Sequence, residues 1–181
     1  TDAIHKRRHF DLQNGKVNEN YHIRISVNEN DKILTLQDNG IGMNSDDLEN
    51  NLSTIAKSGT KEFLKNVQES KEQIGRFGVG FYSVYLVAKN VQILTRKEGC
   101  SLYEWTSDGT ESYNIQECSD NSLLDSVGTI MNISLKEDAF EYSNLDKIKS
   151  IVKYHSNWVD YPIELYPFTE KEISVEEEEH I

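Results

Sequence analysis

Two glycine-containing motifs stand out for the residue types that they bring together. Asp38-Asn39-Gly40-Ile41-Gly42-Met43 follows an alternating segment, 33–36, and predicts a strand that ends in a tight turn. Glycines let a flat ligand approach the backbone, and a carboxylate at the strand end supplies a hydrogen-bond acceptor. Gly75-Arg76-Phe77-Gly78-Val79-Gly80-Phe81-Tyr82-Ser83 places backbone amides at the start of a predicted helix, an arrangement that binds phosphate. Together the motifs indicate a base site and a phosphate site.

Neither motif is specific when taken alone. An Asp-x-Gly-x-Gly turn is often an ordinary hairpin or loop, and a single glycine-rich loop is a weak signal. A dinucleotide-binding fingerprint has the opposite glycine order and follows a buried strand, whereas segment 61–73 is charged and helical in pattern. The chain contains no Gly-Lys-Ser or Gly-Lys-Thr triplet, so it has no P-loop.

With the segment between them, the motifs resemble the N-terminal ATP-binding domain of the heat shock protein 90 chaperone family. That family shares an ATPase superfamily with type II topoisomerases, mismatch-repair MutL proteins and histidine kinases. The resemblance spans nearly the whole chain, and Asn-Leu-x-Thr-Ile-Ala-Lys-Ser-Gly-Thr at 51–60 is specific to the chaperones. Its blocks are Thr1-Asp2-Ala3, 38–43, 51–60, 74–83 and Gly128-Thr129. Ser53 and Arg76 depart from the family pattern, where glycine and glutamine are usual.

The resemblance implies that the chain binds ATP or ADP together with Mg²⁺. Asp38 would accept a hydrogen bond from the adenine amino group, Thr129 would support the same base, and Lys57 would reach the phosphates. The residues that it assigns to nucleotide binding are Asp2, Ala3, Lys6, Asp38, Gly42, Met43, Asn51, Leu52, Lys57, Ser58, Gly75, Phe77, Gly78, Val79, Gly80, Phe81 and Thr129. No catalytic residue or metal ligand is assigned, because the family's general-base glutamate and magnesium-holding asparagine would lie upstream of residue 1. We therefore expect this chain alone to bind ATP without efficient turnover.

Composition limits the other classes of function. With 181 residues, a single domain is expected, and we place an ATP-binding domain at 1–170 and the start of an acidic linker at 171–181. A net charge of −12 argues against a nucleic-acid surface. No apolar run approaches the roughly 20 residues that cross a bilayer, so no membrane partner is expected. Cys100 and Cys118 match no metal-binding pattern.

Periodicity predicts an α+β fold. We expect a helix at 2–9, with Lys6-Arg7-Arg8 in its last turn, and a hairpin of 22–27 with 32–37. A helix from Asn44 would bury Leu48, Leu52 and Ile55. Strands are predicted at 91–97, 102–107, 111–116, 128–135 and 163–165, and a helix would open at a capping box formed by Ser143 and Asp146. These elements fit a two-layer sandwich, the Bergerat-type ATP-binding fold, with helices over a mixed, mostly antiparallel sheet.

The first hypothesis for function is therefore the ATP-binding module of a dimeric chaperone. Its partners would be client proteins and co-chaperones, and its homodimer would form through regions outside this chain. A DNA-transaction ATPase and a non-enzymatic adaptor that has lost its ligand are the alternatives. The segment 103–109 looks more like the organellar branches of the family, mitochondrial or plastid, than like the cytosolic one.

Overall fold

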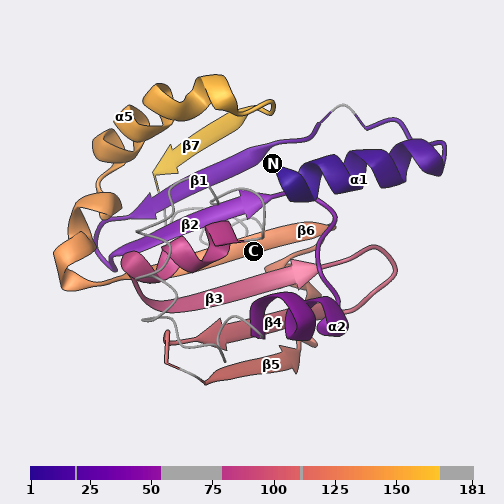
Figure 1. Ribbon diagram of the computed structural model, residues 1–181, viewed down its shortest axis with the longest axis horizontal. Helices are drawn as coiled ribbons and strands as arrows, with labels where there is room; N and C mark the ends of the chain where they lie inside the picture. The colour runs from indigo at the N-terminus through magenta and orange to yellow at the C-terminus, as the bar shows by residue number, and fades with distance from the viewer. Residues whose placement is uncertain (19, 54–78, 111, 168–181) are drawn as a thin grey trace, which may run out of the picture.

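A seven-stranded sheet organises the molecule. The computed structural model describes residues 1–18, 20–53, 79–110 and 112–167. The strands are β1 (Ile23–Asn28), β2 (Ile33–Asp38), β3 (Ala88–Arg96), β4 (Leu102–Ser107), β5 (Tyr113–Glu117), β6 (Gly128–Leu135) and β7 (Ile163–Pro167). They lie in the order β5-β4-β3-β6-β2-β1-β7, as Figure 1 shows. All neighbouring pairs are antiparallel except β1 with β7, which is parallel.

Helical segments lie between groups of strands along the chain. The α-helices are α1 (Asp2–Gln13), α2 (Ser45–Leu48) and α5 (Leu145–His155). A π-helical turn, η1 (Glu49–Ser53), continues α2. The 3₁₀ segments are η2 (Val79–Leu86), η3 (Asn121–Leu123), η4 (Glu137–Ser143) and η5 (Ser156–Trp158). Helices with a mixed, mostly antiparallel sheet confirm the predicted α+β class.

Strand pairing separates an apolar face of the sheet from a polar one. Residues directly opposite each other in neighbouring antiparallel strands point to the same face. One row that crosses the sheet in this way consists of Ile25, Leu36, Met131, Ile93, Trp105 and Ile115. The adjacent row, on the other face, consists of Ser26, Thr35, Asn132, Gln92, Thr106 and Asn114. Alternation along each strand therefore decides which face is covered by helices.

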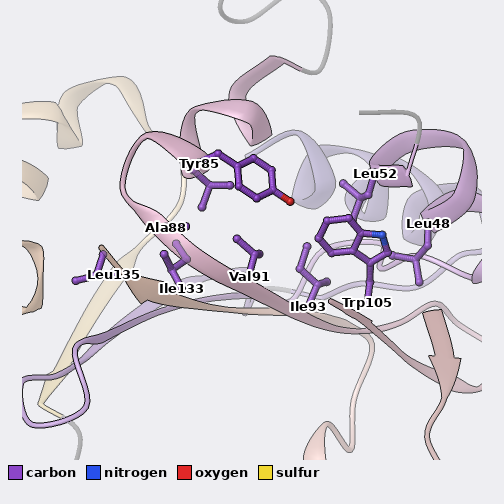
Figure 2. Packing of buried hydrophobic residues seen from close by; sticks show 10 residues of the cluster. Leu48, Leu52, Tyr85, Ala88, Val91, Ile93, Trp105, Ile133 and Leu135 are labelled. Atoms are coloured by element: carbon purple, nitrogen blue, oxygen red, sulfur yellow. The ribbon is translucent and has the colours of Figure 1, made fainter. Parts of the chain in front are cut away.

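The apolar face carries the core. Leu48 and Leu52, from α2 and η1, pack in one buried cluster with Trp105 and Ile93, and Figure 2 shows these side chains around the indole ring. A second cluster joins Ile148 of α5 to Ile25 and Val27 of β1. Burying such side chains contributes about 1.5–3 kcal/mol each. The third predicted member of the α2 stripe, Ile55, lies outside the described residues.

A hydrogen-bonded ladder occupies the polar face. Thr35 donates to Asn132 (2.8 Å), and the Asn132 amide donates to Gln92 (2.8 Å). Gln92 and Gln116 each donate to the Glu104 carboxylate at 2.5 Å. A hollow of about 750 Å³ lies over this face.

The structure corrects two local predictions. Helix α1 continues to Gln13, so Lys6-Arg7-Arg8 lies in its middle rather than in its last turn. The N-cap of α5 is Asn144, whose side chain accepts from the Lys147 amide (3.0 Å), whereas the Ser143 hydroxyl donates to the Phe140 carbonyl (2.7 Å). The helix predicted at the second glycine motif is present as the 3₁₀ helix η2, which begins at Val79, within that motif. The predicted acidic linker at 171–181 lies outside the described residues.

Within the part of the chain that the structure describes, none of the helices has the length and apolar character needed to cross a membrane.

Capping should matter for α2. The Asn44 side chain accepts from the Asp47 amide (2.9 Å), and the Asp47 carboxylate accepts from the Asn44 amide (3.1 Å), which together make a capping box. We expect Asn44→Ala to lower the free energy of unfolding by about 1 kcal/mol in urea titrations, because the Asp47 amide loses its acceptor. Asn44→Ser keeps a capping oxygen and should lose much less. An equal loss in both variants would contradict this role.

Candidate functional site

Three polar side chains lie side by side at one end of the apolar face. Asp38, the last residue of β2, is paired with Thr129 of β6, and Thr129 is paired with Thr95 of β3. Direct pairing puts all three on one face, and alternation places them on the face that also carries Leu36, Met131 and Ile93. The sequence predicted Asp38 and Thr129 as partners at a base site, and the strand register brings them together.

The Asp38 carboxylate is half-buried. Its Oδ1 accepts a hydrogen bond from the Gly40 amide at 2.8 Å. Burial raises the pKa of this carboxyl above its ordinary value, although the hydrogen bond from the Gly40 amide opposes that rise. Among the described residues, no lysine or arginine forms an ion pair with it. The carboxylate therefore keeps an acceptor oxygen for a donor that arrives from outside.

The turn after Asp38 lies very close to the backbone of β3 and β6. Gly42 has a φ of +68°, and a Cβ there would stand 1.9 Å from the Arg96 carbonyl oxygen. Gly128 has a φ of +146°, and its Cβ would stand 2.3 Å from the Asp38 carbonyl oxygen. Only glycine tolerates both the positive φ and the contact, so these two residues fix where the turn lies.

Thr95 joins the parts of the site, and sequence reasoning missed it. Its side chain is fully buried (0% exposed). The hydroxyl accepts from the Met43 amide (2.9 Å) and also lies 2.9 Å from the Thr129 hydroxyl and 3.2 Å from the Gly128 carbonyl oxygen. The sequence marks it only as a threonine at an inward-facing position of a strand whose other inward-facing residues, Val91 and Ile93, are apolar.

Helix α1 contacts the other side of the turn. The Ala3 carbonyl accepts from the Ile41 amide (2.9 Å), and Arg7 donates to the Asn39 carbonyl (2.7 Å). Asp11, further along the helix, accepts from the buried Tyr21 hydroxyl (2.7 Å). Burial and this bond raise the pKa of Tyr21 to about 12. The bonds from Arg7 to Asn39 and from Ile41 to Ala3 hold α1 against the turn.

The remaining predicted residues of α1 lie at its exposed surface. Asp2 and Lys6 are both exposed. The positive charge of Lys6 acts on Asp47, whose carboxylate pairs with Lys97 at 2.9 Å. Burial alone would raise the pKa of Asp47, but the Lys97 bond and the Asn44 amide hold that pKa below its ordinary value.

Two apolar residues predicted for the site pack against the core of the same face. Met43 and Phe81 pack against the core cluster that contains Leu52. The Phe81 ring meets Trp105 edge to face, with centroids 5.7 Å apart. Asn51, on η1, is exposed. A half-buried acceptor and a hydroxyl beside an apolar surface can recognise one edge of a planar heterocycle.

Only some of the other predicted residues lie in the described part of the chain. Val79 and Gly80 open η2. Lys57, Ser58, Gly75, Phe77 and Gly78 lie outside the described residues. The 750 Å³ hollow is lined by none of the predicted residues, because it lies on the polar face. The ranges that the structure describes hold no group of three or more His, Cys, Asp or Glu that could bind a metal ion.

Comparison with known proteins places this arrangement in context. A family model described as "Histidine kinase-, DNA gyrase B-, and HSP90-like ATPase" matches residues 12–136. The chain is 39% identical over 187 residues to "Endoplasmin homolog" of Dictyostelium discoideum, covering 99% of this chain and 24% of that protein. It is 40% identical over 187 residues to "Chaperone protein HtpG" of Sulfurovum sp. (strain NBC37-1), covering 99% of this chain and 29% of that protein.

The name of a third relative includes a cellular compartment. The chain is 38% identical over 198 residues to "TNF receptor-associated protein 1 homolog, mitochondrial" of Dictyostelium discoideum, covering 99% of this chain and 27% of that protein. The chain thus spans about a quarter of the length of these relatives.

The close approach at Gly42 gives a prediction with a matched control. Gly99 also has a positive φ (+75°), but a Cβ there would meet no atom within 4 Å. Gly99→Ala should therefore cost only the strain of its backbone conformation, about 1 kcal/mol. Gly42→Ala should cost clearly more, because the turn must also move away from Arg96. Thermal unfolding of both variants is the measurement, and equal shifts in Tm would contradict the close approach.

Proposed function

Since this chain belongs to the histidine kinase-, DNA gyrase B- and HSP90-like ATPase family and is an ATP-binding domain of the heat shock protein 90 type, we propose that Asp38 and Thr129 recognise adenine. The observation that carries this proposal is their direct pairing across β2 and β6. Adenine presents an amino group, which is a donor, next to a ring nitrogen, which is an acceptor. A carboxylate beside a hydroxyl complements that edge, whereas the carbonyl oxygen of guanine would face the carboxylate unfavourably.

The rest of the nucleotide would extend along the surface between α1 and η2. Gly42, Met43, Leu52 and Phe81 would line the base on its apolar side. Gly42 lies against the Arg96 backbone, so its position is fixed by contacts within the protein. Asp2, Ala3, Lys6 and Asn51 would contact the sugar or phosphates.

The proposed contacts with the phosphates rest on the family resemblance. Backbone amides at 78–81, with Gly75, Phe77, Lys57 and Ser58, would hold the phosphates of ATP. When Mg²⁺ is bound with the nucleotide, it neutralises part of the phosphate charge. The contribution of this chain's own residues is to bind and orient the nucleotide.

The activity of the whole protein is a wider proposal, because the chain spans about a quarter of its relatives. Nucleotide binding and hydrolysis would drive the clamp closure of a dimeric chaperone, which acts on client proteins with co-chaperones. Dimerisation would occur outside this chain, after an ATP-binding domain at 1–170 and a linker from 171. A relative whose name includes "mitochondrial" supports an organellar compartment.

We predict that Asp38→Asn weakens ADP binding. Asparagine keeps the shape of aspartate but removes the charged acceptor. A hydrogen bond to a charged group is worth roughly 1.5–3 kcal/mol, so the Kd should rise by about tenfold to a hundredfold in calorimetry. Equal affinities would refute the assignment of Asp38.

A stability measurement separates lost recognition from lost folding. Because burial raises the pKa of Asp38, the charged form destabilises the ligand-free protein at pH values above that raised pKa. Asp38→Asn should therefore be at least as stable as the wild type at neutral pH. As the pH falls through the raised pKa, the wild type becomes neutral at this residue and the difference should shrink.

A second test uses competition. Inhibitors that occupy the adenine pocket of this chaperone family should displace ATP from this chain, because its residues Asp38, Gly42, Met43, Phe81 and Thr129 match that pocket. Displacement of a fluorescent ATP analogue is the measurement. An inhibitor that binds while the analogue stays bound would show that the two sites differ.

A further inference from the structure

The contacts of the Thr95 hydroxyl extend the site beyond its predicted members. They come from separate segments: Met43 in the turn after β2, and Gly128 with Thr129 at the start of β6. The threonine itself is fully buried, so it reaches no ligand directly. A hydroxyl has one proton to donate and two lone pairs to accept with. Its three neighbours therefore compete for one proton and two acceptor positions.

The Met43 amide can only donate, so it occupies one lone pair of Thr95. Two arrangements remain for the proton. In the first, Thr95 donates to the Gly128 carbonyl (3.2 Å) and Thr129 donates to Thr95 (2.9 Å). The Thr129 hydroxyl can then act toward a ligand only as a hydrogen-bond acceptor. In the second, Thr95 donates to Thr129, and the Thr129 proton is free to point outward.

We propose that Thr95 is a positioning residue for base recognition, because it holds the Met43 backbone and directs the Thr129 proton toward the ring nitrogen of adenine. This inference rests on the proposed function. Adenine offers an acceptor next to its amino group, so adenine binding selects the second arrangement. A bond donated into the Thr129 oxygen also strengthens the bond that Thr129 donates, since linked hydrogen bonds polarise one another.

The test compares variants of the 181-residue chain by calorimetry with ADP and Mg²⁺. Thr95→Val removes the hydroxyl and nearly keeps the shape, and Thr95→Ser keeps the hydroxyl. Thr35→Val is the matched control, because Thr35 is also a strand threonine with a side-chain bond (2.8 Å to Asn132), but it lies on the polar face. Thr95→Val should weaken ADP binding roughly five- to thirtyfold. Thr95→Ser and Thr35→Val should stay within about threefold of the wild type.

A double variant distinguishes positioning from a general structural role. If Thr95 acts through Thr129, the combined Thr95→Val and Thr129→Val chain should lose less affinity than the product of the two single losses, by about threefold or more. A purely structural role would lower Tm and leave the two losses multiplicative. If Thr95→Val does not fold, Thr95→Cys replaces it, and its weak donor and acceptor should give an intermediate loss.

The outcomes are distinct. Absence of ADP binding to the wild type would refute the proposed function itself. With ADP bound by the wild type, the inference is overturned by wild-type affinity in Thr95→Val, by an equal loss in Thr95→Ser, or by multiplicative losses in the double variant. Weak binding in Thr95→Val, recovery in Thr95→Ser and a non-multiplicative double variant would support it.

Discussion

The site depends on how closely the backbone after β2 lies against β3 and β6. Two glycines make this possible, because Gly42 approaches Arg96 and Gly128 approaches Asp38 where any Cβ would clash. The same proximity lets the Met43 amide reach the Thr95 hydroxyl. Moving this turn outward by one carbon–carbon bond length would break that bond and shift the wall beside Asp38. The geometry of the candidate site is thus set first by backbone packing.

Asp38 illustrates the balance between stability and binding. Its burial disfavours the charged form, and the Gly40 amide offsets only part of that cost. No basic side chain in the described ranges pairs with it to offset the rest. A paired carboxylate would be more stable in the free protein, but its acceptor oxygens would then be occupied. Such a local cost is common where a protein keeps a group ready for a ligand.

The sequence predicted the elements better than it predicted their junctions. Alternation identified the β1–β2 hairpin and the strands from β3 to β7, because burial of one face imposes a period of two. The N-cap of α5 was placed one residue early, since Ser143 and Asn144 are both good capping residues and only the backbone decides between them. The π-helical turn at Glu49–Ser53 has no periodic signal that separates it from an α-helix.

The candidate site was predictable only in part. Motif resemblance named Asp38 and Thr129, and the register of β2 with β6 shows that they are neighbours. Thr95 could not be found in this way, because threonine is an ordinary strand residue. Its importance arises from three contacts with residues between 33 and 52 positions away in the sequence. Such contacts become visible only when the strand order is known.

The pairing of β7 with β1 has a consequence for synthesis of the chain. Ile23 is opposite Ile163, so one edge of strand β1 stays unpaired until a partner 140 residues later in the sequence has been translated. At about 5–20 residues per second, that interval is roughly 7–28 s. During this time one edge of β1 exposes unpaired amides and carbonyls, and α5 is absent from the Ile25 and Val27 cluster. The nascent chain therefore carries an open strand edge, the usual starting point for aggregation, until almost the last described residue has been made.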